Sequence, residues 1–221
     1  MRIVRLMTRW ATFDCYGTLI DWHGGIRAEL ARLWPDEHAD ELLRRYHELE
    51  PEIEHVEPGL SYRQVMQRVL ARLGDVPPGE EDALGRALPG WSVFPEVREA
   101  LERAREHGWR LAILSNTDRD FIEASKAAIG VPFDETVVAS EIGSYKPATK
   151  HWEEFAKRTG AVPARHVHVA QSMFHDIVTA NALGLPSVWI NRRGERYDTA
   201  PTRELPDLAD LPEVLDGLVA P

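Results

Sequence analysis

Short apolar runs alternate with amphipathic stretches through the second half of the chain. Four runs have the length and character of buried strands, at residues 111–114, 136–139, 167–170 and 187–190. Four stretches repeat apolar residues at helical spacing, at residues 96–107, 118–128, 150–159 and 176–183. This alternation predicts βαβ units, and therefore an α/β fold with a parallel sheet buried on both faces.

The pattern before residue 92 is different. From Gly25 to about Trp91, apolar residues recur at helical spacing and few β-branched runs interrupt them. The apolar stripes are Ile26, Leu30 and Leu33, then Leu42, Leu43, Tyr46 and Leu49, then Tyr62, Val65, Val69, Leu70 and Leu73. We therefore expect a helical domain at residues 23–92, inserted into an α/β core made of residues 8–22 and 93–221.

A further short apolar run, residues 10–13, ends at Asp14, and Gly17 and Thr18 follow. This is the pattern of a buried strand that ends in a tight turn and holds a carboxylate at its carboxyl end. Ligands of open α/β sheets bind in the crevice at such strand ends, where an aspartate can act as a nucleophile. An aspartate that merely begins a turn is the alternative interpretation, and this segment alone does not decide between them.

Polar residues also follow the later predicted strands. They are Ser115 and Asn116 after the second, Lys146 in the loop after the third, and Gln171, Ser172 and Asp176 after the fourth. Each has an ordinary structural explanation: a helix cap, a solvated loop lysine, or an acid at a helix start. Because the carboxyl ends of parallel strands meet at one edge of the sheet, their common order favours a single site.

Composition narrows the classes of function. The 221 residues are 43% hydrophobic, enough for a sizeable core, and the net charge of −10 argues against nucleic acid as a partner. No apolar run approaches the ~20 residues that cross a bilayer, so no membrane association is expected, and the N-terminal segment lacks the features of a signal peptide. Cys15 is the only cysteine, which excludes an intrachain disulfide and indicates a cytoplasmic setting.

The strand-end residues resemble the motifs of the haloacid dehalogenase superfamily, most closely those of the 2-haloacid dehalogenases (type II). The matching stretches are FDCYGTL at 13–19, LAILSN at 111–116, YKP at 145–147 and WINR at 189–192. The resemblance implies a doubly wound parallel sheet, a helical cap in the position of the 23–92 insert, and Asp14 as the nucleophile. Caps of this family often pair, so it also suggests a homodimer.

Tyr16 supports the subfamily assignment on chemical grounds. Phosphatases of the superfamily carry a second aspartate two residues after the nucleophile, because an alkoxide needs a general acid to leave. Tyr16 stands at that position, and a halide leaves without a proton. Gln171 stands where phosphatases place another acid, which leaves Asp14 and Asp176 as the obvious carboxylates, too few for a magnesium site. We therefore expect no metal and no cofactor.

The expected reaction is hydrolysis of a small 2-halo carboxylic acid through an ester on Asp14. Lys146 would keep Asp14 ionised, Asp176 would hold Lys146 and position water, and Thr18 and Asn116 would orient Asp14 or the substrate. Five side chains are expected to contact the substrate: Tyr16, Arg45, Ser115, Trp152 and Gln171. Arg45 corresponds to a cap arginine that faces the halide in the resembling enzymes, and Arg44 is the alternative.

Several residues depart from the family pattern. Trp152 stands for a tyrosine, Gln171 for a serine and Met173 for an asparagine, which affects the loop that serves the hydrolytic water. His175 is a candidate substitute base, although an exposed loop histidine is the commoner case. His166 and His168 form a weak metal-binding pattern and are expected to face a helix or solvent.

Two alternative functions stay open at this point. One is a hydrolase of the same superfamily that acts on another small carboxylate or on a phosphate ester. The other is a catalytically weak protein that binds a small acid or a partner protein through its cap.

Overall fold

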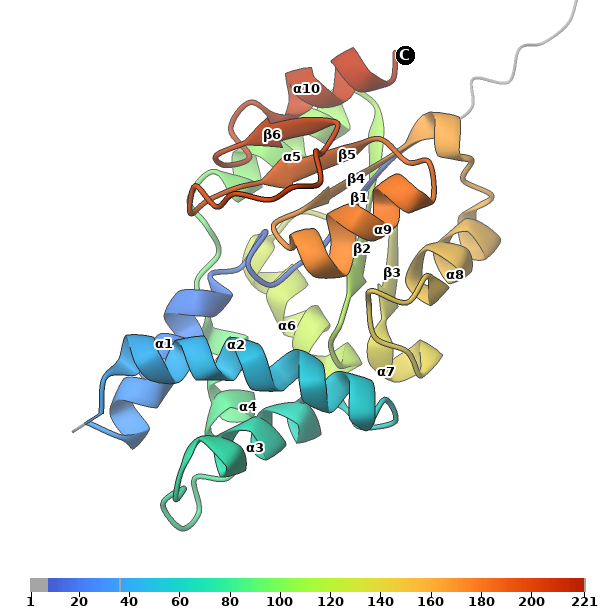
Figure 1. Ribbon diagram of the computed structural model, residues 1–221. Coiled ribbons are helices and arrows are strands. Elements are labelled where there is room, and N and C mark those ends of the chain that lie inside the picture. The colour runs from blue at the N-terminus through green and yellow to red at the C-terminus, as the bar shows by residue number, and fades with distance from the viewer. Residues whose placement is uncertain (1–7, 36, 221) are drawn as a thin grey trace, which may run out of the picture.

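The computed structural model describes residues 8–35 and 37–220. Its sheet has six strands, all parallel, in the order β3-β2-β1-β4-β5-β6 (Figure 1). The strands are β1 (Arg9–Phe13), β2 (Trp109–Ser115), β3 (Glu135–Val138), β4 (His166–Ala170), β5 (Ser187–Ile190) and β6 (Arg203–Leu205). The predicted α/β class is therefore confirmed, and β6 is the strand that the apolar pattern did not predict.

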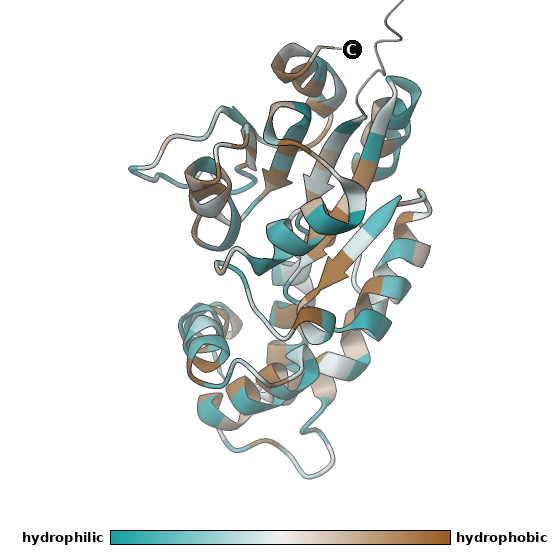
Figure 2. Ribbon diagram, turned by 90° about the vertical axis from the view of Figure 1, so that its right-hand side faces the viewer, coloured by the Kyte–Doolittle hydropathy of each residue, from teal (hydrophilic) through white to brown (hydrophobic). Residues whose placement is uncertain are grey.

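Helices cover both faces of this sheet (Figure 2). Ala11 and Phe13 of β1 point into the main core, with α5 (Val97–Glu106), α6 (Arg119–Ile129) and α10 (Leu211–Leu218). Trp10, one position earlier, points to the opposite face, where α8 (Lys150–Thr159) and α9 (Val178–Ala182) pack. Because successive residues of a strand face opposite sides, β1 contributes to both cores.

The segment between β1 and α5 is helical, as predicted. It contains α1 (Trp22–Leu33), α2 (Ala39–Val56), α3 (Tyr62–Leu73), the short α4 (Ala83–Ala87) and a 3₁₀ turn (Leu88–Gly90). These helices lie beyond the carboxyl ends of the strands, so they face the strand-end loops (Figure 1). The proposed domain boundaries at residues 22 and 93 stay a prediction.

Hydrogen bonds join the helical insert to the core close to the strand ends. The Asp118 carboxylate, just after β2, accepts from the backbone N–H groups of Tyr62 and Arg63 at 2.9 and 3.0 Å. These are unpaired donors of the first turn of α3, whose positive end favours an acid. The Tyr145 hydroxyl donates to the carbonyl of Leu60 at 2.9 Å. The insert is thus anchored where the candidate site lies.

Two further elements complete the fold. A four-residue helix, α7 (Ala139–Ile142), follows β3, and one turn of π-helix, Met173–Ile177, precedes α9. The predicted helix at 176–183 therefore begins earlier than expected, with one more loosely wound π turn. No helix among the described residues is long and apolar enough to cross a membrane.

Candidate active site

Asp14 follows β1 directly, at the point where the strand order reverses. Its backbone N–H donates to Val169 of β4, and its side-chain Oδ2 accepts from the Thr18 hydroxyl at 2.9 Å. Gly17 has φ +90°, a conformation that side chains rarely adopt, and this turn brings Thr18 back to Asp14. The Thr18 oxygen also accepts from the N–H of Gln171 at 2.9 Å. The carboxylate is therefore fixed from two neighbouring strand ends.

Lys146 joins two carboxylates inside the protein. Its Nζ lies 3.0 Å from Asp14 Oδ1 and 2.7 Å from Asp176 Oδ1, and it donates to the Leu114 carbonyl at 2.9 Å. The residue is only 2% exposed, and these three acceptors account for the three N–H donors of the ammonium. The sequence prediction that these three residues converge is confirmed.

Burial and charge oppose each other in this triad. Burial raises the pKa of Asp14 above its ordinary value, against the lowering effect of Lys146. Burial acts on Asp176 in the same direction, but there the Lys146 ammonium prevails, and the pKa of that carboxyl lies well below its usual range. Burial alone would lower the pKa of Lys146, and the two aspartates raise it instead. The ammonium and the Asp176 carboxylate are accordingly both charged at neutral pH.

A buried histidine holds Asp176, a role that the sequence analysis missed. His168 Nε2 lies 2.9 Å from Asp176 Oδ1, and its Nδ1 lies 2.8 Å from the Thr12 hydroxyl, which also contacts His166 at 2.7 Å. Both histidines are buried and face α8, where they contact Trp152 and Phe155, which is one of the two expected placements. The sequence could have indicated this placement, because His166 and His168 alternate with Val167 and Val169 and therefore share one face of a buried strand.

Ser115 and Asn116 end β2 beside this triad, and both line the cavity in front of Asp14. The Ser115 hydroxyl is buried and has no hydrogen-bond partner among the described residues. Asn116 instead exchanges hydrogen bonds with the backbone of Lys146, at 2.6 and 3.0 Å, and donates to Glu54 at 3.2 Å. Asn116 forms no hydrogen bond with Asp14 and its amide instead positions the loop that carries Lys146; its expected role in orienting the substrate stays a prediction.

Tyr16 and Gln171 also line the cavity, as expected. The Tyr16 hydroxyl lies 3.0 Å from Ser125, and its ring packs on those of Tyr62 and Trp91. Burial raises the pKa of the Tyr16 phenol well above 10. This group is a poor proton donor for a leaving group.

Two residues that were expected to contact the substrate, Arg45 and Trp152, do not line the cavity. Arg45 donates to the carbonyls of Arg72 and Leu73 at the far side of α2, and Arg44 pairs with exposed glutamates. A helix turns by about 100° per residue, so Arg45 lies about 200° around α2 from His47, which lines the cavity, and therefore points away from it. Trp152 is buried on the other side of the sheet between Trp10 and His168, where core packing determines its place.

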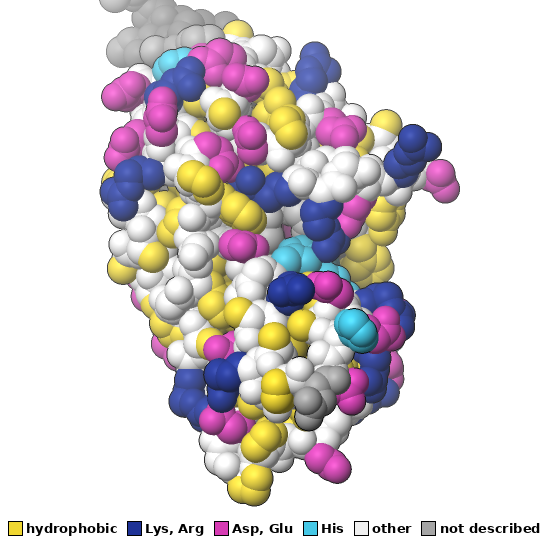
Figure 3. Space-filling view, turned by 90° about the vertical axis from the view of Figure 1, so that its left-hand side faces the viewer, with side chains coloured by type: hydrophobic (Ala, Val, Ile, Leu, Met, Phe, Trp, Pro, Cys, Tyr) yellow, Lys and Arg dark blue, Asp and Glu magenta, His cyan; other side chains and the backbone are white. Residues whose placement is uncertain are grey.

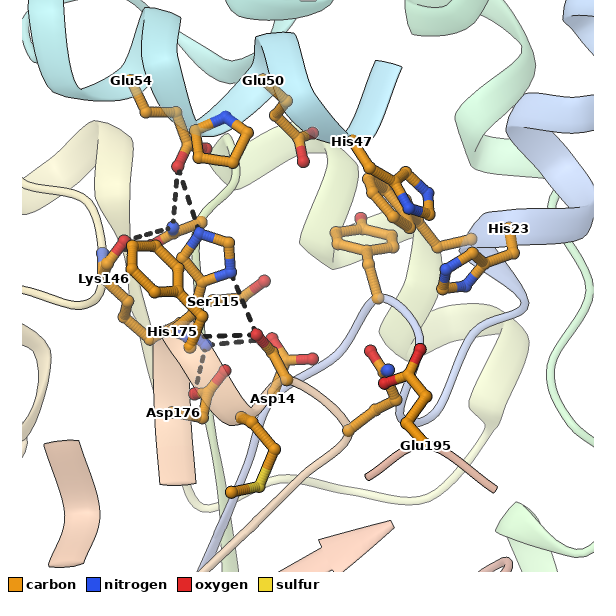
Figure 4. A pocket seen from close by; sticks show the side chains of 18 of the residues that line it. Asp14, His23, His47, Glu50, Glu54, Ser115, Lys146, His175, Asp176 and Glu195 are labelled. Carbon is orange, nitrogen blue, oxygen red and sulfur yellow. Dashed lines mark hydrogen bonds and ion pairs between the residues drawn. The ribbon is translucent and has the colours of Figure 1, made fainter. Parts of the chain in front are cut away.

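The cavity itself has a volume of about 610 Å³ and lies between the strand ends and α2 (Figure 4). Glu50 and Glu54, two acids that the sequence analysis did not single out, point into it from α2. Glu50 and Glu54 lie four and eight residues after the buried Tyr46, on the same face of α2. This spacing could have identified them from the sequence. His175 is mostly buried in the wall, with Nδ1 3.1 Å from the Ser172 hydroxyl, rather than in an exposed loop.

The mouth of the cavity carries basic residues. Arg193 and Arg196, in the loop after β5, line it and are exposed. His23 and His47 also line it and are half-buried. Figure 3 shows histidine side chains recessed in a hollow with basic and acidic groups around its rim. Burial lowers the pKa of His23 to about 3 and that of His47 to about 4, with Arg193 adding to both effects, so these rings are neutral.

Comparisons with known proteins agree with this geometry. A family model described as haloacid dehalogenase-like hydrolase matches residues 8–184. An (S)-2-haloacid dehalogenase of Pseudomonas putida is 28% identical, over 92% of this chain and 96% of its own. A glyceraldehyde 3-phosphate phosphatase of Methanopyrus kandleri is 33% identical over 56% of this chain and 55% of its own. The solved structure of an L-2-haloacid dehalogenase from Xanthobacter autotrophicus has the same fold, with a TM-score of 0.81 at 20% identity over 96% of this chain and 99% of that one.

Proposed function

The chain belongs to the haloacid dehalogenase-like hydrolases, and on that premise we propose that it hydrolyses small 2-halo carboxylic acids through an ester on Asp14. The observation that carries the proposal is the triad of Asp14, Lys146 and Asp176 combined with Tyr16. A buried carboxylate faces the cavity with its charge balanced by an ammonium, and no acid stands at position 16 to protonate a leaving oxygen.

The first step is a displacement at carbon. An Asp14 carboxylate oxygen attacks the carbon that bears the halogen, the carbon–halogen bond breaks, and the halide leaves with the bonding electrons. Lys146 and Thr18 hold the carboxylate in place, so that its reacting oxygen approaches in line. Ser115, with its free buried hydroxyl, is the group in the wall suited to bind the substrate carboxylate.

Hydrolysis of the ester completes the reaction. Water attacks the ester carbonyl of Asp14, which releases a 2-hydroxy acid of inverted configuration and restores the carboxylate. Asp176 Oδ2 is buried and accepts no hydrogen bond from the described residues, so it is the acceptor available to position that water. Met173 and Gln171 supply no carboxylate for this step, and His175 is a neutral base in the same wall, because burial lowers its pKa to about 4.

The residues around Asp14 do not fit a divalent cation well. Such an ion would need several oxygen ligands, but Asp14 Oδ1 and Asp176 Oδ1 both bind the Lys146 ammonium, and Gln171 offers a neutral amide. No group of three or more His, Cys, Asp or Glu side chains within residues 8–35 and 37–220 is arranged to hold a metal.

Chloride release from 2-chloropropionate tests the proposal. The wild-type protein should release chloride with or without a chelator, and Asp14→Asn should release none. Magnesium-dependent release of phosphate from a simple phosphate ester, without chloride release, would identify a phosphatase instead. If neither product forms, the proposal is wrong, and the two alternatives are hydrolysis of another small carboxylate and a binding function.

A further inference from the structure

Two buried carboxyl groups of α2 face the cavity without a role in the proposed reaction. Glu50 and Glu54 lie one helical turn apart and are 6% and 5% exposed. Neither forms an ion pair with a lysine or arginine in the described part of the chain; His175, whose ring is neutral because burial lowers its pKa to about 4, lies 3.9 Å from Glu54. Figure 4 shows both side chains above Asp14, on the opposite wall.

The interior carries more acid than base. Four carboxyl groups, those of Asp14, Asp176, Glu50 and Glu54, are buried near one buried ammonium, Lys146, which is already bound by both aspartates. Burial raises the pKa of Glu50 to about 7 and that of Glu54 well above its ordinary value. An unpaired buried carboxylate is costly, and a cation supplied by a ligand removes that cost.

Hydrogen bonds around Glu50 favour its ionised form. The Tyr62 hydroxyl donates to Glu50 Oε1 at 2.7 Å and the Tyr46 hydroxyl donates to the same oxygen at 3.3 Å. Trp22 Nε1 in turn donates to the Tyr62 oxygen at 2.9 Å, so the whole chain of donors is directed at Glu50. Its other oxygen, Oε2, accepts no hydrogen bond from the described residues and is available to a ligand.

Aromatic rings complete this wall. Trp22 stacks on His47 with ring centres 5.0 Å apart, and Tyr16 stacks on Tyr62 at 6.4 Å. All four rings line the cavity. The negative faces of aromatic rings, combined with a carboxylate, are the usual surroundings of a bound ammonium group.

The Ser115 hydroxyl is an independent sign of a ligand in the same cavity. It is 1% exposed, has no hydrogen-bond partner in the described structure, and lies at the Asp14 end. We infer that the cavity binds a small acid with an ammonium-bearing tail: its carboxylate lies at Ser115 and its ammonium at Glu50 and Glu54. This inference deepens the proposed function, on which the placement of the carboxylate rests, by naming the class of substrate.

The test uses ligands that cannot react. Calorimetry compares the ω-amino acids from 3-aminopropanoate to 6-aminohexanoate with the fatty acids in which a methyl group replaces the ammonium, such as 5-aminopentanoate with hexanoate. At least one amino acid of the series should bind about tenfold tighter than its methyl counterpart, equivalent to about 1.4 kcal/mol. In the double variant Glu50→Gln/Glu54→Gln this preference should disappear.

Glu52→Gln is the matched control, because Glu52 is exposed on the same helix and pairs with Arg72. It should keep the preference. The inference is overturned if no amino acid binds tighter than its methyl counterpart, or if the double variant retains the preference. Since these ligands carry no halogen, the result is independent of chloride release from 2-chloropropionate, which tests the reaction itself.

Discussion

Removal of the buried ammonium is the perturbation whose effect the structure defines best. In Lys146→Met the side chain keeps a similar length, but Asp14 and Asp176 lose the cation that lies 3.0 and 2.7 Å from them. Breaking a buried ion pair by removing one partner costs about 3–5 kcal/mol of unfolding free energy. Lys157→Met is the control, because Lys157 is 77% exposed and pairs with Glu154 at the surface, where such a pair contributes at most about 1 kcal/mol.

The pH dependence separates this effect from simple loss of packing. Without Lys146, burial raises the pKa of both aspartates above the unfolded value of about 4, so the folded variant binds more protons than its unfolded chain and loses stability as pH rises. In the wild type, the lowered pKa of Asp176 means that its contribution to folding stability is complete above about pH 4, and the raised pKa of Lys146 maintains that residue's contribution to about pH 10. The raised pKa of Asp14 removes some stability as pH rises in both proteins. The difference in unfolding free energy between the wild type and Lys146→Met should therefore be small near pH 5 and large near pH 8.

Urea unfolding followed by circular dichroism at about pH 5 and about pH 8 measures this gap. We expect a difference of about 3–5 kcal/mol at the higher pH and a clearly smaller one at the lower pH. A loss below about 1 kcal/mol, or an equal loss at both pH values, would refute the assignment of Lys146 as the charge partner of both aspartates.

Three further substitutions test individual contacts by steady-state chloride release. Thr18→Val removes one donor to Asp14 and should lower kcat by about 10–100-fold, as expected for a hydrogen bond to a charged group; an unchanged kcat would show that the contact is dispensable. Arg45→Ala should leave kcat/KM within about twofold of the wild-type value, since the Arg45 guanidinium binds two carbonyls outside the cavity. A tenfold loss would show that Arg45 acts on the halide after all. His168→Asn should lower kcat more than it changes KM and move the acidic limb of the pH profile to higher pH, because Asp176 then loses a partner that lowers its pKa; a change in KM alone would argue for a structural role.

The order of strands and helices was predictable because each element has its own local pattern. The four apolar runs after residue 108 are all strands of the sheet, since a strand buried on both faces is almost entirely apolar. β6 was missed because Arg203–Leu205 is short, lies at the edge and is mostly exposed, so it carries no apolar signal. The start of the π-helix at Met173 was missed because its first residues repeat no helical pattern.

The candidate site was predictable only where the backbone position decides the side chain's place. Asp14 directly follows β1 and Ser115 is the last residue of β2, and parallel strands bring these ends together regardless of helix packing. Residues on α2 depend on how that helix is rotated against the core. The resemblance predicted that Arg45 faces the cavity. In the structure Tyr46 and Glu50 occupy the inner face of α2, and Arg45 points outward.

Labelled water tests the covalent intermediate most directly. The protein, in excess over 2-chloropropionate, turns over once in H₂¹⁸O, and mass spectrometry then examines the product and the tryptic peptide of residues 10–27, which contains Asp14 and Asp21. We predict an unlabelled 2-hydroxy acid and one ¹⁸O atom in the peptide, located at Asp14 by fragmentation, because water attacks the Asp14 ester carbonyl. A labelled product with an unlabelled Asp14 would show that water attacks the substrate directly, and would contradict the role of Asp14 as nucleophile.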